Sequence, residues 1–385
     1  MNNLPDTHPL SSGRTAESRL VRAYQGARQQ TTPVWFMRQA GRSLPEYREL
    51  RVGTRMLDAC LNPELASEIT LQPVRRHGVD AAIFFSDIVI PLRLAGVDVD
   101  IVAGKGPVLG KPIHTAADVA ELTSVDPASL DAAVFAPIAE AVRRTVTELE
   151  TIGAGDTPLI GFAGAPFTLA AYLVEGGPSK DHIRARTLMH ADPAAWAALM
   201  DWTADVTGAF LRAQVLAGAS AAQLFDSWAG ALSLDDYEQY AAPASARALT
   251  HVRDLAYPVA AAGVGSAAGA AAEPAGVRNV PIVHFGVGTG ELLTAMHDVG
   301  ADVVGIDYRI PLDEASRRLG HTVPVQGNID PAILDAPWPV LEAHVLDVLE
   351  RGKSAPSHVL NLGHGVPPET DPAVLTRLVE FVHGI

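Results

Sequence analysis

The sequence has a single cysteine, Cys60, in 385 residues. An intrachain disulfide is therefore impossible, and a zinc site built mainly from thiolates is excluded. Long apolar runs are also missing, because Asp87 and Arg93 interrupt the best candidate before it reaches the roughly 18 residues of a transmembrane helix. The first residues, MNNLPDTHPLSSGRTAES, lack the apolar stretch of a secretory signal peptide. These absences predict a cytoplasmic protein that does not enter a membrane.

Positive charge is scarce as well. The chain has 29 Lys and Arg residues against 44 Asp and Glu residues, a formal net charge of −15. Nucleic acids and anionic membrane surfaces bind broad basic patches, so neither partner is expected. An anionic small molecule remains compatible with this charge, because a small basic pocket can lie in an acidic protein.

Apolar residues are plentiful and regularly arranged. They make up 48% of the chain, enough for a large core. Short runs rich in Val, Ile and Phe alternate with longer helical patterns, which predicts an α/β fold with a parallel sheet. About eight such repeats favour a single (β/α)8 TIM-type barrel over the two or three domains that length alone suggests. The predicted strands lie within residues 33–39, 81–87, 158–164, 221–227, 281–287, 302–308, 323–329 and 358–364.

Helix boundaries are marked by capping residues. Asn62 with Pro63 and Asp192 with Pro193 are typical of helix N-termini, and Gly78 is typical of a helix C-terminus. A further helix is expected to start near Pro166.

Three segments depart from the repeating pattern. Residues 97–113 alternate in polarity and contain Gly and Pro, which predicts a β-hairpin excursion. Residues 259–276 are an Ala/Gly tract, interpreted as a flexible surface insertion without chemistry. Residues 1–17 are expected to form a flexible N-terminal tail, so that the barrel domain comprises residues 18–385.

Active sites of such barrels lie at the carboxyl ends of the strands. Each polar residue there could by itself be a capping residue in a loop. The whole set, however, is expected to converge on one mouth, the open end of the barrel at the carboxyl ends of its strands. The set consists of Arg38, Gln39, Ser86, Asp87, Asp226, Ser227, His284, Asp307, Asn328, Asn361 and His364.

The first of these strand ends is unusually basic. Residues 38–55 carry five arginines and two glutamates, a local charge of +3. Arginine binds carboxylates and phosphates in a planar, bidentate manner and keeps its charge when buried. Arg38 and Arg42 are therefore candidate anion-binding residues. The alternative, a solvated helix face with internal ion pairs, suits Arg48 and Arg55 better.

Other candidates at the mouth have competing interpretations. Asp87 is a lone carboxylate in an apolar run, and burial raises the pKa of such a group unless donors hold its charge. A structural aspartate that accepts backbone amides is the alternative. From the residues alone, Tyr172 is better explained as a half-buried aromatic of a helix. His364, between two glycines, could reach a ligand or simply bond to a nearby carbonyl.

A glycine-rich turn at residues 284–291, HFGVGTGE, resembles a phosphate-binding loop. Its spacing is G-x-G-x-G rather than the G-x-G-x-x-G of dinucleotide-binding folds, and it lies in the middle of the chain. No nucleotide site is predicted there.

Two longer motifs carry a family resemblance. PVWFMRQAGR (33–42) and GFAGAPFTLAAY (161–172) resemble the two signatures of the uroporphyrinogen decarboxylases. FSD (85–87), LFDSWAG (224–230), VQGNIDP (325–331) and NLGHG (361–365) support the match, which runs from about residue 20 to the end. The resemblance implies a one-domain barrel, a homodimer, and a cofactor-independent, metal-free decarboxylation of uroporphyrinogen in haem biosynthesis.

The resemblance also assigns residues by motif. It implies Asp87, Arg38, Tyr172 and His364 as catalytic residues. Ser43 departs from the aromatic residue that usually follows the second arginine in the family. The implied substrate-binding residues are Arg38, Gln39, Ala40, Gly41, Arg42, Asp87, Tyr172, Ser227 and His364.

Two alternatives remain open at this point. A related barrel methyltransferase would need a zinc site with His and Cys ligands, whereas Cys60 lies away from the predicted strand ends. A non-catalytic tetrapyrrole-binding protein would need Arg38 and Arg42 but not Asp87.

Overall fold

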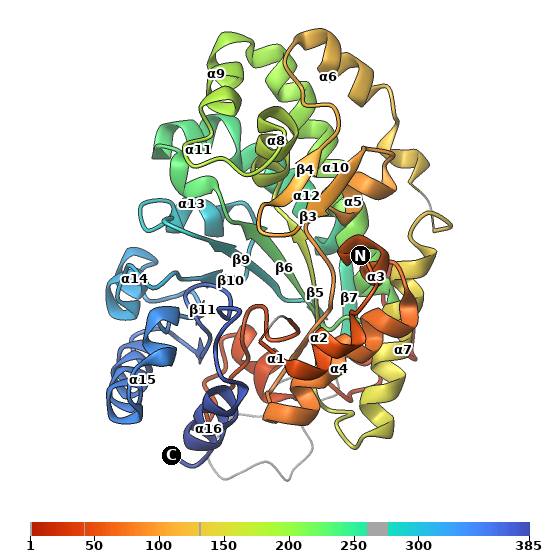
Figure 1. The fold of residues 1–385 in the computed structure, drawn as a ribbon. Helices are drawn as coiled ribbons and strands as arrows, with labels where there is room; N and C mark the ends of the chain where they lie inside the picture. Colours follow the sequence, from red (N-terminus) through yellow and green to blue (C-terminus); the bar gives the residue numbers. More distant parts are fainter. Residues whose placement is uncertain (1, 42, 131, 260–275) are drawn as a thin grey trace.

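The computed structural model describes residues 2–41, 43–130, 132–259 and 276–385. At its centre lies a seven-stranded, all-parallel sheet that curls within a layer of helices (Figure 1). The strands follow one another across the sheet in chain order, and each comes from one of the predicted apolar runs. They are β2 (Ala82–Ile83), β5 (Leu159–Gly164), β6 (Ala221–Asp226), β9 (Ile282–Gly286), β10 (Val303–Gly305), β11 (Val325–Gln326) and β12 (His358–Val359).

The first predicted run, residues 33–39, lies between the two edges of this sheet. On one side, Leu360 N–H donates to Pro33 O at 2.9 Å, and Val34 forms a parallel bridge with Leu360. On the other side, Asp80 N–H donates to Val34 O at 2.8 Å. The segment therefore has backbone bonds toward both β12 and β2.

Helices connect the strands and cover the outer face of the sheet (Figure 1). The predicted caps are confirmed: Asn62 Oδ1 accepts from Glu64 N–H and Leu65 N–H, Gly78 has the left-handed conformation, and Asp192 caps the longest helix. The longer helices are α4 (Pro63–His77), α7 (Ala136–Thr151), α8 (Pro166–Glu175), α9 (Ile183–Ala191), α10 (Pro193–Ala217), α12 (Ala242–Arg253), α15 (Trp338–Gly352) and α16 (Pro372–His383). The shorter ones are α1 (Arg19–Tyr24), α2 (Pro45–Leu50), α3 (Met56–Cys60), α5 (Ile90–Leu94), α6 (Ala116–Thr123), α11 (Leu234–Tyr240), α13 (Leu293–Asp298) and α14 (Leu312–Arg318).

The hairpin excursion is confirmed. β3 (Val99–Val102) and β4 (Gly106–Leu109) pair in antiparallel fashion outside the central sheet. Leu109 N–H donates to Gly176 O and Ile113 N–H to Leu173 O, so the hairpin is bonded to the C-terminal end of α8.

The N-terminal residues differ from the expectation. β1 (Asn2–Asn3) pairs in parallel with β7 (Leu255–Val259), which also pairs with β8 (Gly276–Asn279). Leu4 and Leu10 are buried, and His8 Nε2 lies 2.9 Å from Val215 O. The prediction of a flexible tail over residues 1–17 is therefore wrong for residues 2–17, because a few apolar side chains within a polar segment suffice to anchor it.

The predicted Ala/Gly insertion, residues 259–276, falls mostly outside the described residues. Val259 and Gly276, which bound it, are paired with each other at the ends of β7 and β8. None of the helices in the described part of the chain combines the length and the apolar content that a membrane span requires.

A charged cluster holds the amino end of the sheet together. The Asp80 carboxylate, directly before β2, lies 2.9 Å from Arg19 and 2.8 Å from His383, and it accepts Val34 N–H at 2.8 Å. These contacts join α1, the first extended segment and α16 at one point.

Candidate active site

The four predicted catalytic residues influence one another at the carboxyl ends of the strands. Arg38 ends the first extended segment, Asp87 follows β2, Tyr172 lies in the helix after β5, and His364 follows β12. The charge of Arg38 acts on the other three side chains, and the charge of Asp87 acts on the Tyr172 hydroxyl. The structure thus gathers these four residues at one end of the sheet.

Arg38 has a backbone conformation rarely found outside glycine. Its φ angle is 63°, in the left-handed region, where a non-glycine residue costs on the order of 1 kcal/mol. Its side chain crosses Gly365, since a Cβ atom there would lie only 2.4 Å from Arg38 Cδ. Among the described residues it has neither a hydrogen-bond nor an ion-pair partner, and it is exposed. The guanidinium is therefore available to an anion.

The loop that follows Arg38 is held by Gln39. Its buried side chain accepts Phe36 N–H and donates to Ala81 O, both at 2.9 Å. Ala40 and Gly41 are also buried. The Gln39 side chain thus ties the Arg38 loop to the start of β2, whereas Arg42 lies outside the described residues and its assignment stays a prediction.

Asp87 is half-buried in the loop that follows β2, which ends at Ile83. Val89 N–H donates to its Oδ1 at 3.1 Å. Removal from water raises the pKa of the Asp87 carboxyl, and the Val89 bond and the Arg38 charge only partly oppose this rise. No cation of the described residues forms an ion pair with it, so the carboxylate can accept hydrogen bonds from a ligand.

Tyr172 projects from α8 and packs against an indole. Its ring lies 3.9 Å from that of Trp228, centroid to centroid, at an interplanar angle of 30°. Burial, and then the negative charge of Asp87, raise the pKa of Tyr172 above its ordinary value. The hydroxyl therefore stays protonated at neutral pH and can donate a hydrogen bond. Ser227, half-buried, directly precedes Trp228 in the turn after β6.

His364 is exposed in the glycine-flanked loop after β12. Its Nδ1 accepts Gly365 N–H at 2.8 Å, so the proton of the neutral ring lies on Nε2. Partial desolvation, followed by the charges of Arg38 and Arg309, lowers its pKa below the ordinary value. A neutral His364 offers its Nε2–H to a bound acceptor.

The sequence interpretation missed Arg309, whose charge reaches the same site. Its guanidinium pairs with the buried Asp307 and lies 4.5 Å above the Tyr308 ring. The only signal in the sequence was its position, two residues beyond an aspartate at a predicted strand end.

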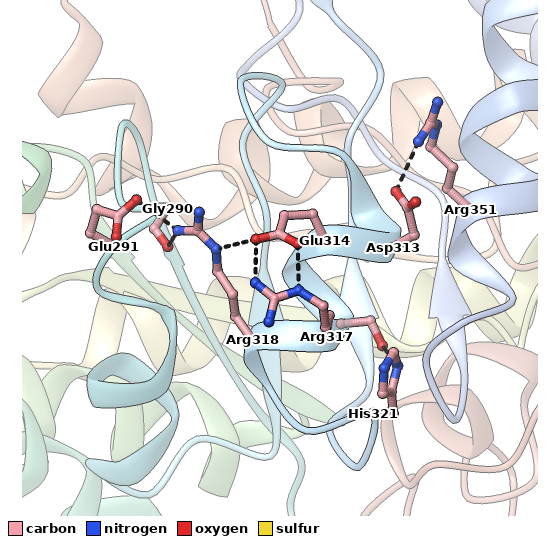
Figure 2. A network of polar contacts seen from close by, with 9 residues as sticks. Gly290, Glu291, Asp313, Glu314, Arg317, Arg318, His321 and Arg351 are labelled. Atoms are coloured by element: carbon pink, nitrogen blue, oxygen red, sulfur yellow. Dashed lines mark hydrogen bonds and ion pairs between the residues drawn. The ribbon is translucent and has the colours of Figure 1, made fainter.

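The glycine-rich turn has a structural role. Asp307 accepts Gly288 N–H at 2.6 Å, and Arg318 Nη1 donates to Gly290 O at 2.8 Å. Arg318 lies between Glu291 and Glu314 (Figure 2) and donates a hydrogen bond to each carboxylate, at 2.8 Å in both cases. The arginine beside this turn is thus neutralised by two carboxylates, which does not favour phosphate binding.

The described residues also include no cluster of three or more His, Cys, Asp or Glu side chains suited to a metal ion. Cys60 is buried at the end of α3, and burial raises the pKa of its thiol.

Comparisons with known proteins show which family the chain resembles. The family model described as uroporphyrinogen decarboxylase (URO-D) matches residues 15–385. Two similar relatives are both named uroporphyrinogen decarboxylase. That of Leifsonia xyli subsp. xyli (strain CTCB07) is 72% identical over 384 residues, 99% of this chain and 98% of that protein. That of Arthrobacter sp. (strain FB24) is 64% identical over 373 residues, 97% of this chain and 99% of that protein.

A solved structure of a methyltransferase from Methanosarcina mazei has a similar fold. It superimposes with a TM-score of 0.73, covers 96% of this chain and 98% of its own, and is 18% identical. At that identity the likeness concerns the fold alone. The extent and identity of the sequence matches place the chain in the uroporphyrinogen decarboxylase family.

Proposed function

We propose that this protein removes carbon dioxide from the four acetate side chains of uroporphyrinogen III, which yields coproporphyrinogen III. The observation that carries the proposal is the gathering of Arg38, Asp87, Tyr172 and His364 at one mouth in a member of this family. The chemistry requires no cofactor and no metal ion, because the pyrrole ring itself can accept the electrons.

The substrate carries eight carboxylates, and the proposed clamps for them are Arg38 and Arg42. Tyr172, Ser227 and the Nε2–H of His364 are proposed to orient further carboxylates. Gln39, Ala40 and Gly41 belong to the proposed binding loop through their backbone, since the Gln39 side chain is already bonded to Phe36 and Ala81.

The four inward-pointing pyrrole N–H groups of the substrate are proposed to donate to Asp87. These bonds would replace the water that burial removes and would hold the carboxylate ionised. In each round a proton first adds to the pyrrole α-carbon, and Asp87 stabilises the resulting cation. The bond to the carboxylate carbon then breaks, and its electron pair flows into the ring as carbon dioxide leaves.

Protonation of the exocyclic carbon and loss of the α-proton complete the round. Each acetate thus becomes a methyl group, with net uptake of one proton.

The proposal is tested by incubating the purified protein anaerobically with uroporphyrinogen III. The products are then oxidised and separated by chromatography. Stepwise appearance of hepta-, hexa-, penta- and tetracarboxylic porphyrins is expected. Binding without carboxylate loss would instead indicate a tetrapyrrole-binding protein. Stoichiometric zinc in the purified protein, together with methyl transfer, would indicate a methyltransferase.

The proposal also includes the closure of the barrel, the cellular location and the oligomeric state. The first extended segment, bonded toward both edges of the sheet, supports closure as an eight-stranded (β/α)8 barrel. The protein is proposed to act in the cytoplasm as a homodimer, without nucleic acid or membrane partners. Light scattering of the purified protein would test the dimer.

A further inference from the structure

A buried group of polar residues lies behind the mouth and is not used by the proposed reaction. Asp226, at the end of β6, is completely buried, as is Thr168 in the first turns of α8. The Thr168 hydroxyl donates to Asp226 Oδ1 at 2.9 Å. The same hydroxyl oxygen accepts Trp228 N–H at 3.3 Å. Thr168 therefore connects the carboxylate to the turn that carries Ser227 and Trp228.

This turn docks on one face of α8. Thr168 and Tyr172 are four residues apart, so they lie one above the other on that face. Thr168 bonds the Trp228 backbone, and the Tyr172 ring stacks on the Trp228 indole. The opposite indole face is covered by the His182 ring, at 4.2 Å and 25°. The indole is thus held between two rings and fixed at its backbone by one hydroxyl.

The far side of Asp226 has an unsatisfied partner. Its Oδ2 lies 3.6 Å from His284 Nε2, just beyond hydrogen-bond length, and both atoms are buried without a hydrogen-bond partner in the described residues. His284 Nδ1 lies 3.0 Å from Met296 O, which can only accept, so Nδ1 carries a hydrogen. The two unpartnered atoms therefore face each other at the far side of Asp226.

We propose that Asp226 and Thr168 form a relay that positions Trp228 against Tyr172, and that both are positioning residues for the mouth. The inference rests on the proposed function of Tyr172. The relay sets the direction of the Tyr172 hydroxyl, because a shift of the Ser227–Trp228 turn would move the indole on which the Tyr172 ring packs.

The kinetic test replaces Thr168 by valine, which has nearly the same shape but no hydroxyl. Thr168→Val is expected to lower kcat for uroporphyrinogen about tenfold, equivalent to about 1.4 kcal/mol, with KM changed less than about twofold. Thr168→Ser restores the hydroxyl and is expected to restore kcat. Thr145→Val is the matched control, since it removes a buried hydroxyl that bonds only within α7.

A double-mutant cycle separates positioning from a general loss of structure. In a Tyr172→Phe background, Thr168→Val is expected to cost no further activity, because the hydroxyl that it positions is already gone. The same tenfold loss in both backgrounds, or full kcat in Thr168→Val alone, would overturn the inference.

A fluorescence measurement tests the inference without requiring enzymatic activity. The fluorescence emission of Trp228 is obtained by subtracting the spectrum of the protein that carries Trp228→Phe from the spectrum of the protein that keeps Trp228. When both proteins also carry Thr168→Val, this emission is expected to be stronger and at longer wavelength than in the wild-type background. An unchanged difference spectrum would contradict the relay even if the wild type proved inactive. Inactivity of the wild type toward uroporphyrinogen would instead refute the proposed function.

Two substitutions at Asp226 test the contribution of its side chain. Asp226→Asn keeps an acceptor for Thr168 and supplies its own N–H to His284 Nε2, so the emission of Trp228 is expected to remain as in the wild type. Asp226→Leu removes both contacts and is expected to change that emission as Thr168→Val does. Equal emission from the two Asp226 variants would contradict the role of this side chain.

Discussion

Two aspartates flank β2, one before and one after the strand, and have opposite surroundings. Asp80, before β2, contacts Arg19, His383 and the Val34 amide, and its side chain is only 6% exposed. Asp87, after β2, accepts one backbone amide and has no ion pair among the described residues. The amino end of the sheet therefore uses its charge for cohesion, whereas the carboxyl end leaves its charge available to a ligand.

The same contrast applies to the arginines. Arg19 at the amino end is committed to Asp80, and Arg318 beside the glycine-rich turn is committed to Glu291 and Glu314. Arg38 at the mouth has a left-handed backbone and no partner among the described residues. A strained residue with an unpaired charge contributes little to stability and is typical of functional sites.

The largest expected effect comes from Asp87→Asn. Loss of one preorganised charge that stabilises a cationic transition state costs roughly 10²–10³-fold in kcat, or about 2.7–4 kcal/mol. The rate of carboxylate loss from uroporphyrinogen measures it. A kcat within threefold of the wild type would contradict the role of Asp87.

A smaller effect, on stability rather than activity, is expected from Asp80→Asn. Hydrogen bonds to charged groups contribute about 1.5–3 kcal/mol, and the 45% exposure of Arg19 places this cluster near the lower end. The free energy of unfolding should therefore fall by roughly 2 kcal/mol, with kcat almost unchanged. Asp298→Asn, at an exposed carboxylate, is the control and should change little. Equal stability of Asp80→Asn and Asp298→Asn would remove the contrast between the two ends.

The smallest effect is expected from Gly365→Ala. The added methyl group would meet the Arg38 side chain at 2.4 Å, and that side chain must move aside. KM for uroporphyrinogen is expected to rise about fivefold, roughly 1 kcal/mol, at similar kcat. If KM stays unchanged, then the position of Arg38 over Gly365 does not matter for binding.

Much of the central sheet could be predicted because its strands are buried on both faces and stand out as apolar runs. The caps Asn62 and Asp192 could be predicted because their side chains bond to the helices that they begin. The packing of residues 2–17 could not, since its anchors, Leu4 and Leu10, are isolated apolar residues with no periodicity. The contact between β1 and β7 joins residues more than 250 positions apart, and no local pattern records such a pairing.

The candidate site was predictable only in part. Arg38 and Asp87 stand out as charges at the ends of apolar runs, and the family motifs name Tyr172 and His364. The buried role of the Gln39 side chain, the contribution of Arg309 and the Thr168–Trp228 contact depend on distances across the fold. A sequence shows that a residue is polar, but not whether a backbone amide or a ligand will satisfy it.

In the described part of the chain the mouth leaves Asp87 without an ion-pair partner, and the pH dependence of unfolding shows whether this costs stability. A carboxyl whose pKa is raised on folding destabilises the folded state above that pKa, and the cost disappears as the pH falls below the ordinary aspartate value. Asp87→Asn is therefore predicted to be more stable than the wild type at pH 7, with the difference shrinking toward zero in acid. A variant that is less stable than the wild type at pH 7 would contradict this cost in stability.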